Sequence, residues 1–433
     1  MKHYHLLSIL AAAGILLPAQ HAAAFTATLP EFGGAIHLAP KKGKKDKKGK
    51  KKKTLPVSSK QLFSPTEKQI AKAEEYLDSI GQPSYEDAIK NDDDKALYAI
   101  LTTGEATAQQ ALFAACRWGK THYVKLLLKA PDIDINCDDS WDGTPLNIAI
   151  QYGHLKTVKL LATSPGIDVN RGTPFGDAVR AYHKEMVQFL MRVPKIKIGN
   201  YSELELAIFK GDTAEVKRIL TEQKPNINKK TEDNVDSPGG TPLIYAAGFG
   251  HTDIVKLLLE QPNININIID DNGISALTAA AMHGHVDIMT ILLQRPEIII
   301  NRQYHNSQYH EGKNPLPYAA KNGHSEAVRL LVNIPEIVEE KLEENGEALY
   351  LAAENGHSEV VRLLVNIPWM VEEKGDVAFI SAIEEKHVKC VKILLSTGKI
   401  DVNKPFEGET PLEIATRKSS EEIQELLRKA GAK

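Results

Sequence analysis

Seven histidines recur along the chain, and histidine is the commonest side-chain ligand of protein-bound metal ions. They are His154, His183, His251, His285, His324, His357 and His387. Each follows the same repeated turn, and the helix layers of a stack lie about 8–10 Å apart. Imidazoles held that far apart cannot meet at one metal ion, whose bonds to nitrogen are about 2 Å long. We therefore expect these histidines to be structural and the chain to hold no metal ion.

The sequence lacks the motifs that mark phosphate binding, zinc binding or nucleophilic catalysis. The chain has no Gly-rich phosphate loop ending in Lys-Ser or Lys-Thr, no paired-cysteine zinc spacing and no nucleophile elbow. Carboxylates are plentiful, but they fall mostly in turns and on solvated helix faces. The sequence therefore predicts a protein that is not an enzyme and that carries no cofactor.

The residues around the histidines belong to an internal repeat. Residues 319–341 and 352–374 are identical at nineteen of 23 positions, at an offset of 33 residues. Weaker copies open with Thr144-Pro145-Leu146, Thr241-Pro242-Leu243 and Thr410-Pro411-Leu412. Alignment on this triplet predicts eight to eleven units, which start near residues 82, 110, 144, 173, 202, 241, 275, 314, 347, 377 and 410.

The repeated pattern resembles the ankyrin repeat, which has a Thr-Pro-Leu opening, an Ala-Ala pair, Gly-His, an aliphatic run and Asp-Val-Asn. Asp168-Val169-Asn170 and Asp401-Val402-Asn403 preserve that ending. The resemblance covers residues 82–433. It implies an all-α solenoid of about 8–11 helix-turn-helix units, joined by short hairpin fingers, that binds other proteins.

Elementary physical chemistry supports this arrangement. A Thr before a Pro favours a helix start, because its side-chain oxygen accepts a backbone N–H and Pro fits the first turn. Paired alanines such as Ala246-Ala247 let neighbouring helices approach closely. The glycine of each Gly-His pair suits the left-handed residue that ends a helix. One helix pair has two apolar faces and cannot bury both alone, so the units must stack into one continuous core.

Polar helices are predicted to close both ends of the stack. Ser64-Pro65-Thr66-Glu67 has the pattern of a capping box, and a helix within residues 66–81 would cover the first unit with Ile70, Leu77 and Ile80. Ser419-Ser420-Glu421-Glu422 predicts a second capping box. The helix after it would turn Ile423, Leu426 and Leu427 inward, and Glu425, Arg428 and Lys429 toward water.

The first 24 residues have the three-part pattern of a secretory signal peptide. Lys2 precedes an apolar stretch from Leu6 to Leu17, and Ala22-Ala23-Ala24 offers small residues for cleavage. The apolar stretch is shorter than the roughly 20 residues that a transmembrane helix needs. We therefore expect an exported protein, periplasmic or secreted, whose mature chain begins at Phe25.

Residues 25–65 are predicted to be a disordered segment. Within it, Lys41–Lys53 holds ten lysines in thirteen residues. Residues 1–60 carry a net charge of +10, against −13 for the rest of the chain. Such a tract fits a solvated tether, an electrostatic patch for anionic polymers or lipid head groups, or a nuclear localisation signal. The signal peptide argues against the third.

The three cysteines cannot all pair within one chain, although export would place them in an oxidising compartment. Cys116 and Cys390 fall in apolar helical patterns, and Cys137 falls in a loop. We expect three free thiols, with Cys116 and Cys390 buried.

The resemblance also implies where a partner binds, because ankyrin proteins contact partners through their fingers and the end of each first helix. The corresponding residues near the turns are Trp118, Tyr152, Phe209, Phe249, Met282 and His283. An insertion at about Arg302–Asn314 adds Tyr304 and Tyr309 on a finger. Exposed aromatic rings on a rigid surface are effective binding anchors, so these eight residues form the predicted partner site. The alternative is that the rings fold sideways and pack between neighbouring units.

Together these observations predict a monomeric protein that binds or scaffolds another protein outside the cytoplasm. A second possible function is an adaptor whose lysine tract attaches it to an anionic polymer or a membrane surface. A third, a nuclear or cytosolic regulator, applies if the first 24 residues are not a signal peptide. The sequence indicates no small-molecule substrate, and the identity of the partner is not encoded in the repeat pattern.

Overall fold

The chain folds into helices, as the repeat pattern predicted. The computed structural model describes residues 66–130, 133–139, 143–231, 239–300, 313–339, 341 and 343–433. The predicted signal peptide, the lysine tract, and Tyr304 and Tyr309 lie outside the described residues. Strand-like pairing in the described part consists of three isolated bridges, which confirms the all-α class. In the same part of the chain, no helix is both long and apolar enough to cross a membrane.

The helices follow one another in eleven pairs within the described residues. The first four pairs are α4 (Tyr85–Lys90) and α5 (Asp94–Thr103), α6 (Ala108–Arg117) and α7 (Thr121–Leu127), α8 (Pro145–Gln151) and α9 (Leu155–Ala162), and α10 (Pro174–Arg180) and α11 (Lys184–Leu190). The unit that starts near residue 173 therefore forms a helix pair, although its sequence is degenerate.

The other seven pairs complete the stack. They are α12 (Glu203–Lys210) and α13 (Thr213–Glu222), α14 (Pro242–Gly248) and α15 (Thr252–Leu259), α16 (Ala276–Met282) and α17 (Val286–Leu293), α18 (Pro315–Lys321) and α19 (Ser325–Val332), α21 (Glu343–Glu354) and α22 (Ser358–Leu364), α23 (Pro368–Glu384) and α24 (Val388–Ser396), and α25 (Pro411–Arg417) and α26 (Glu421–Lys429). A short helix, α20 (Pro335–Glu339), lies between α19 and α21.

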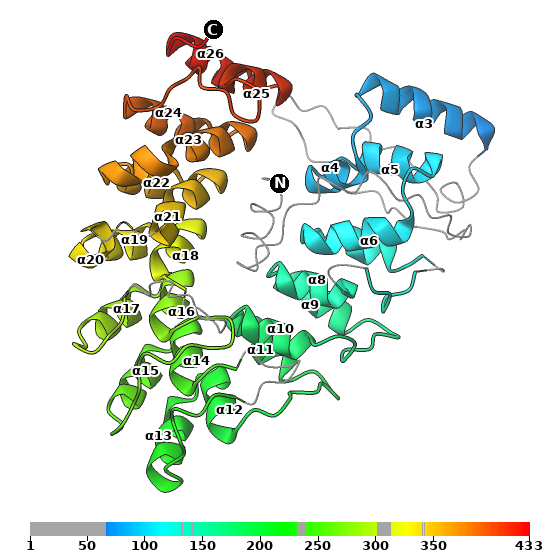
Figure 1. The fold of residues 1–433 in the computed structure, drawn as a ribbon. Coiled ribbons are helices and arrows are strands. Elements are labelled where there is room, and N and C mark those ends of the chain that lie inside the picture. The colour runs from blue at the N-terminus through cyan, green and yellow to red at the C-terminus, as the bar shows by residue number, and fades with distance from the viewer. Residues whose placement is uncertain are drawn as a thin grey trace, which may run out of the picture.

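The units stack in two halves. Consecutive first helices pack together within each half, and so do the second helices from α7 onward. Between the halves, α11 packs against α12 instead. Figure 1 shows the N-terminal half, α3–α11, descending one side of the molecule and the C-terminal half, α12–α26, rising on the other. In the C-terminal half, the first helices α14, α16, α18, α21 and α23 lie on the side that faces the N-terminal half (Figure 1).

The turn inside a unit is held by a histidine from the next unit. Gly250 has φ of 73°, a left-handed conformation that glycine adopts without steric cost. The ring of His285 lies over Gly250, and its Nε2 donates to the carbonyl oxygen of Gly248 at 3.1 Å. Equivalent bonds to the preceding unit are made by His154, His324, His357 and His387. These histidines join the units, so their role is structural, as their spacing predicted.

The remaining two histidines of the set occupy the same position. His183 and His251 lie against Gly153 and Gly211 of the preceding units. Burial, together with the positive charge of Lys184, lowers the pKa of His251 to about 4. Burial also lowers the pKa of His183. Both rings are therefore neutral near pH 7 and pack as structural side chains.

Asparagine side chains join the fingers of successive units. Asn136 Nδ2 donates to the carbonyl oxygen of Gly166 at 2.8 Å, and Asn136 Oδ1 accepts the N–H of Asp168 at 2.7 Å. The same pair of bonds is made by Asn170, Asn228 and Asn267. At the end of the chain, Asn403 makes it with Gly431 and Lys433. This asparagine ladder explains the last residue of the Asp-Val-Asn ending.

The fingers take two forms. Asp139↔Gly143, Ile269↔Ser275 and Phe406↔Glu409 form the isolated bridges of short hairpins. The two nearly identical repeats instead continue as helix, in α20 and in the first turns of α23. Both of these segments begin with Pro at a position that suits a helix start, and neither contains the Asp-Val-Asn ending.

The N-terminal end is closed by α3 (Glu67–Ser79), which packs against α5 and buries Leu77. The predicted capping box is displaced. The N-cap is Thr66, whose N–H donates to Gln69 Oε1 at 2.9 Å. The prediction that Ile80 covers the first unit is wrong, because Ile80 lies beyond the last helical turn and is 40% exposed.

The C-terminal end is closed by α26. Ile423 and Leu427 are buried and Leu426 is half-buried, which confirms the predicted inward face. Glu425, Arg428 and Lys429 are exposed, also as predicted. The predicted capping box is wrong, since Ser420 occupies the N-cap position but its side chain makes no capping hydrogen bond.

The three cysteines are free thiols. Cys116 and Cys390 are buried, as predicted, and Cys137 is half-buried. Burial raises the pKa of the Cys390 thiol to about 11 and raises the pKa of Cys116 as well. Since the thiolate is the reactive form, the two buried cysteines are inert near neutral pH.

Candidate protein-interaction surface

Trp118 and Tyr152 are accessible members of the predicted partner site. Both are the C-cap residue of a first helix, Trp118 of α6 and Tyr152 of α8. They are 37% and 42% exposed, and they lie on neighbouring units because α6 packs against α8. Large aromatic rings that remain accessible on a rigid helix end are typical of binding hot spots.

The two helix ends that carry these rings are held together. His154 Nε2 donates to the carbonyl oxygen of Arg117 at 2.8 Å, which ties the start of α9 to the end of α6. The imidazole ring of His154 also lies nearly parallel to the Tyr152 ring, with centroids 6.5 Å apart. The surface is therefore preorganised, and a partner that binds to it loses less conformational entropy than on a mobile loop.

Basic side chains lie beside Trp118. Lys90 Nζ, from the end of α4, is 4.6 Å from the centroid of the indole ring, within the range of a cation–π interaction. Arg117 pairs with Glu86 at 3.1 Å and with Asp139 at 3.4 Å. We call Lys90, Trp118 and Tyr152 the Trp118–Tyr152 surface.

Phe209 and Phe249 were also predicted as partner contacts, and this part of the prediction is wrong. They are 0% and 2% exposed. The Phe209 ring meets Tyr201, Tyr245 and Phe249 edge-on, with centroids 4.9, 5.2 and 5.5 Å away. Phe249 is also covered by Tyr182, whose ring lies 5.7 Å away. These rings pack sideways between units, which is the alternative that the sequence left open.

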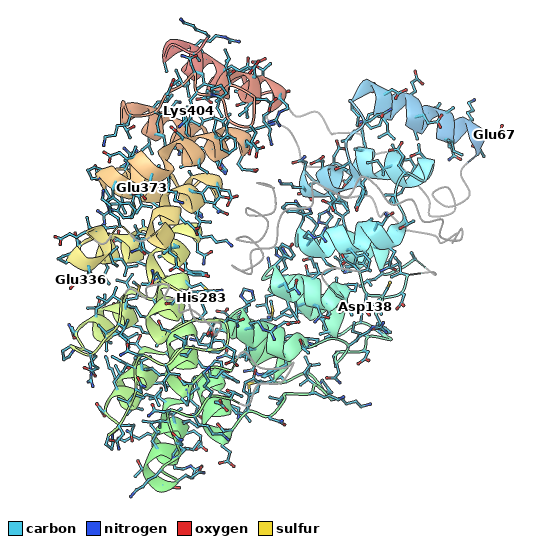
Figure 2. The ribbon with its side chains drawn as sticks, viewed as in Figure 1. Glu67, Asp138, His283, Glu336, Glu373 and Lys404 are labelled. Carbon is cyan, nitrogen blue, oxygen red and sulfur yellow. The ribbon has the colours of Figure 1, made fainter. Side chains whose placement is uncertain are left out.

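Met282 and His283 are partly buried. His283 meets the ring of Tyr182 edge-on at 5.3 Å and stacks on His285 at 6.2 Å. Burial, together with the nearby histidines, lowers the pKa of His283 to about 3. Figure 2 shows His283 on the inner side of the C-terminal half, between the two halves. The ring is therefore neutral and covered on one side by the protein's own tyrosine.

The helix ends farther along the C-terminal half are polar. Tyr350 Oη donates to Glu354 Oε1 at 2.7 Å, and burial together with this glutamate raises the pKa of Tyr350. Arg417 pairs with Glu384 at 3.6 Å and with Glu409 at 2.8 Å. The prediction for Tyr304 and Tyr309 stays a prediction, since both lie outside the described residues.

A cavity of about 340 Å³ lies beside the start of α12, and Glu205 is among its lining residues. Its carboxylate is fully engaged within the protein. Oε2 accepts the N–H and hydroxyl of Ser202 at 2.6 and 2.8 Å, and Oε1 accepts the hydroxyl of Thr231. Glu205 therefore caps α12 and holds its finger. Among the described residues, no group of three or more His, Cys, Asp or Glu side chains is arranged to hold a metal ion.

Two residues of this region were missed by the sequence reasoning. Lys90 contacts Trp118 across a unit boundary, and no local pattern reports such a contact. Tyr182 could have been found, because it stands in the sequence where the Gly-His turn has its glycine. In the structure its φ is 51°. A bulky residue is rarely found in this conformation, so the departure from glycine could have identified Tyr182.

Comparison with known proteins agrees with the geometry. A family model described as ankyrin repeats (3 copies) matches residues 86–173, 204–304, 297–368 and 366–433. The chain therefore belongs to the ankyrin repeat family, whose repeats form protein-interaction modules that are generally not enzymes. The chain is 31% identical over 143 residues to the ankyrin repeat protein FPV223 of fowlpox virus (strain NVSL), a match that spans 31% of this chain and 96% of the relative.

Among solved structures, the chain is similar to the crystal structure of the human ASB11 ankyrin repeat domain. The match has 21% sequence identity and a TM-score of 0.44, and it covers 53% of this chain and 98% of that chain.

Proposed function

We propose that this protein is a binding or scaffolding protein, without enzymatic activity, that holds a protein partner on the Trp118–Tyr152 surface. The observation that carries the proposal is the exposure of two large rings, 37% and 42%, at the ends of neighbouring helices. The His154 bond to Arg117 holds these two helix ends in one relative position. A rigid pair of accessible rings offers large contact area at low entropic cost.

Replacing both Trp118 and Tyr152 by alanine is expected to weaken partner binding by about 30-fold or more, because truncated hot-spot residues cost about 2 kcal/mol or more. The midpoint of thermal unfolding should stay nearly unchanged, since both side chains are accessible. The partner would be recovered by affinity purification with the unchanged full chain. Its Kd would then be measured by titration calorimetry for both forms of the protein.

Phe406→Ala is the matched control for this experiment. Phe406 is 37% exposed, like Trp118, but it lies in the finger before α25, in the C-terminal half. This variant should bind the partner as tightly as the unchanged chain. The proposal would be contradicted if the Trp118/Tyr152 double variant bound the partner as tightly as the unchanged chain. It would also be contradicted if Phe406→Ala weakened binding as much as the double variant does.

The location that we propose is outside the cytoplasm, either periplasmic or secreted. It is supported by the signal-peptide pattern of residues 1–24. N-terminal sequencing of the protein from separated cell fractions would test whether it is exported. A chain that begins at Phe25 supports export, whereas a chain that keeps residues 1–24 in the cytosol or nucleus supports an ankyrin regulator.

Attachment to anionic polymers or lipid head groups is a second function that can coexist with the first. The observation in its favour is the run of ten lysines between Lys41 and Lys53. Near an anionic surface, each lysine contributes up to about 1 kcal/mol at low salt, and salt screens this attraction.

Deleting Lys41–Lys53 is therefore expected to leave folding unchanged and to reduce sedimentation with vesicles that contain phosphatidylserine. The measurement compares the two forms from dilute buffer to near-molar salt, with neutral phosphatidylcholine vesicles as the control. Retention that does not change with salt would exclude the electrostatic mechanism.

A further inference from the structure

The junction between the fourth and fifth units differs from the junctions on either side of it. In the fifth unit, Asp212 stands where the histidine of the Gly-His turn is expected, and it caps α13 by accepting the N–H of Glu215 at 3.0 Å. In the fourth unit, Tyr182 stands where the glycine is expected. Gly199 occupies the position of the ladder asparagine and has no side chain to bond the next finger. Neither the histidine contact nor the ladder joins these two units.

Aromatic ring contacts and one side-chain hydrogen bond join the fourth and fifth units instead. The ring of Phe175, from α10, lies 5.8 Å from Tyr201 and 6.2 Å from Phe209. At the surface, Gln188 Nε2 donates to the carbonyl oxygen of Lys210 at 3.0 Å. The residues between 173 and 204 are also left out of the ankyrin family match. This junction therefore lacks both of the repeated contacts that join the units on either side of it.

Tyr182 compensates by reaching past the fifth unit. Its ring lies against Gly248, where a Cβ would be 2.2 Å from a ring carbon, and it contacts Phe249 and His283 of the sixth and seventh units. Tyr182 is 6% exposed, and its hydroxyl has no hydrogen-bond partner among the described residues. The tyrosine is therefore held by its ring alone, at a site that only glycine on α14 leaves open.

We propose that the junction of the fourth and fifth units is a hinge and that Tyr182 is the latch that holds it closed. Each half is one continuous stack, so the halves would rotate as bodies about the contact of α11 with α12. Withdrawal of the Tyr182 ring would uncover the C-terminal ends of α14 and α16, where Gly248, Phe249 and His283 lie. Such a hinge changes the shape of the solenoid, and it does not depend on whether a partner binds the Trp118–Tyr152 surface.

The test measures the distance between the two halves of the full chain by double electron–electron resonance. Spin labels would be attached at Lys125→Cys on α7 and Lys389→Cys on α24, both exposed positions. Cys137→Ser removes the accessible native thiol, while Cys116 and Cys390 are buried. A second pair within one half, Lys256→Cys and Lys389→Cys, reports whether that half itself changes.

Tyr182→Gly removes the latch but suits the left-handed turn, so the turn itself is not strained. We expect it to broaden the distance distribution between the halves at least twofold and to leave the pair within one half unchanged. Tyr182→Phe keeps the ring and should behave like the unchanged chain. Lys386→Gly is the matched backbone control, because Lys386 is an exposed residue at the same turn position with φ of 60°.

An unchanged distribution in Tyr182→Gly would overturn the proposal. The proposal would also be overturned if Lys386→Gly or Tyr182→Phe broadened the distance distribution between the halves as much as Tyr182→Gly does. Equal broadening of the distribution within the C-terminal half would overturn it as well. Broadening between the halves in Tyr182→Gly alone would establish both the hinge and the latch.

Discussion

Phe209→Ala is expected to lower the free energy of unfolding by about 3–5 kcal/mol, the range for truncating a buried aromatic ring. Phe209 is fully buried and touches rings from the fourth, fifth and sixth units, including Phe175 and Tyr245. Those rings are fixed by their own helices and cannot all move into the space that the deletion leaves. Urea denaturation followed by circular dichroism would measure the loss.

Phe406→Ala serves as the control, since it makes the same chemical change at a residue that is 37% exposed. It is expected to change stability by about 0.5 kcal/mol or less. Hydrogen exchange adds a local readout, because the amides of α12 and α14 should lose protection in Phe209→Ala. Equal costs for the two substitutions would show that Phe209 is not part of a packed core.

Gly250→Ala is expected to cost about 2–3 kcal/mol through two separate effects. A residue with a Cβ in the left-handed conformation costs about 1–2 kcal/mol, and Gly250 has φ of 73°. The new Cβ would also lie 2.5 Å from Cε1 of His285, which must move away. His285 then loses its bond to the carbonyl oxygen of Gly248, which is worth about 1 kcal/mol.

Gly398→Ala separates these two effects. Gly398 has a similar φ of 66°, but a Cβ built there meets nothing within 4 Å. It should therefore show only the backbone strain, and the difference between the two variants measures the contribution of the histidine contact. Thermal or urea unfolding of both variants gives the comparison. If Gly398→Ala costs as much as Gly250→Ala, the histidine rings contribute little to joining the units.

The repeat pattern identified the units because the signals that define them are local. Thr241 caps α14 by accepting the N–H of Ile244, as its position before Pro242 indicated. The capping boxes at the two ends were harder to place. Several Ser and Thr residues stand close together there, and the choice among them depends on which side chain can reach a backbone N–H. Thr66 is the N-cap residue of the first described helix.

Burial at the helix ends could not be read from the repeat. Trp118 and Phe249 occupy the same position, the C-cap of a first helix, yet one is 37% exposed and the other 2%. Phe249 is covered by Phe209 and by Tyr182, and Tyr182 is 67 positions earlier in the chain. At Trp118 it is the ammonium group of Lys90 that lies over the ring.

The sequence by itself determined the ankyrin-type units, their stacking order and the structural role of the repeated histidines, because each follows from residues within one period or the next. Only the tertiary structure decided which aromatic rings face a partner and which fill the core. It also decided where the stack divides, at the junction of α11 and α12. The physical reason is that the burial of a side chain depends on which residues from distant parts of the chain pack against it. A repeated pattern specifies the contacts between neighbouring units. It does not specify a contact between units that are not neighbours, such as that of Tyr182 with Phe249.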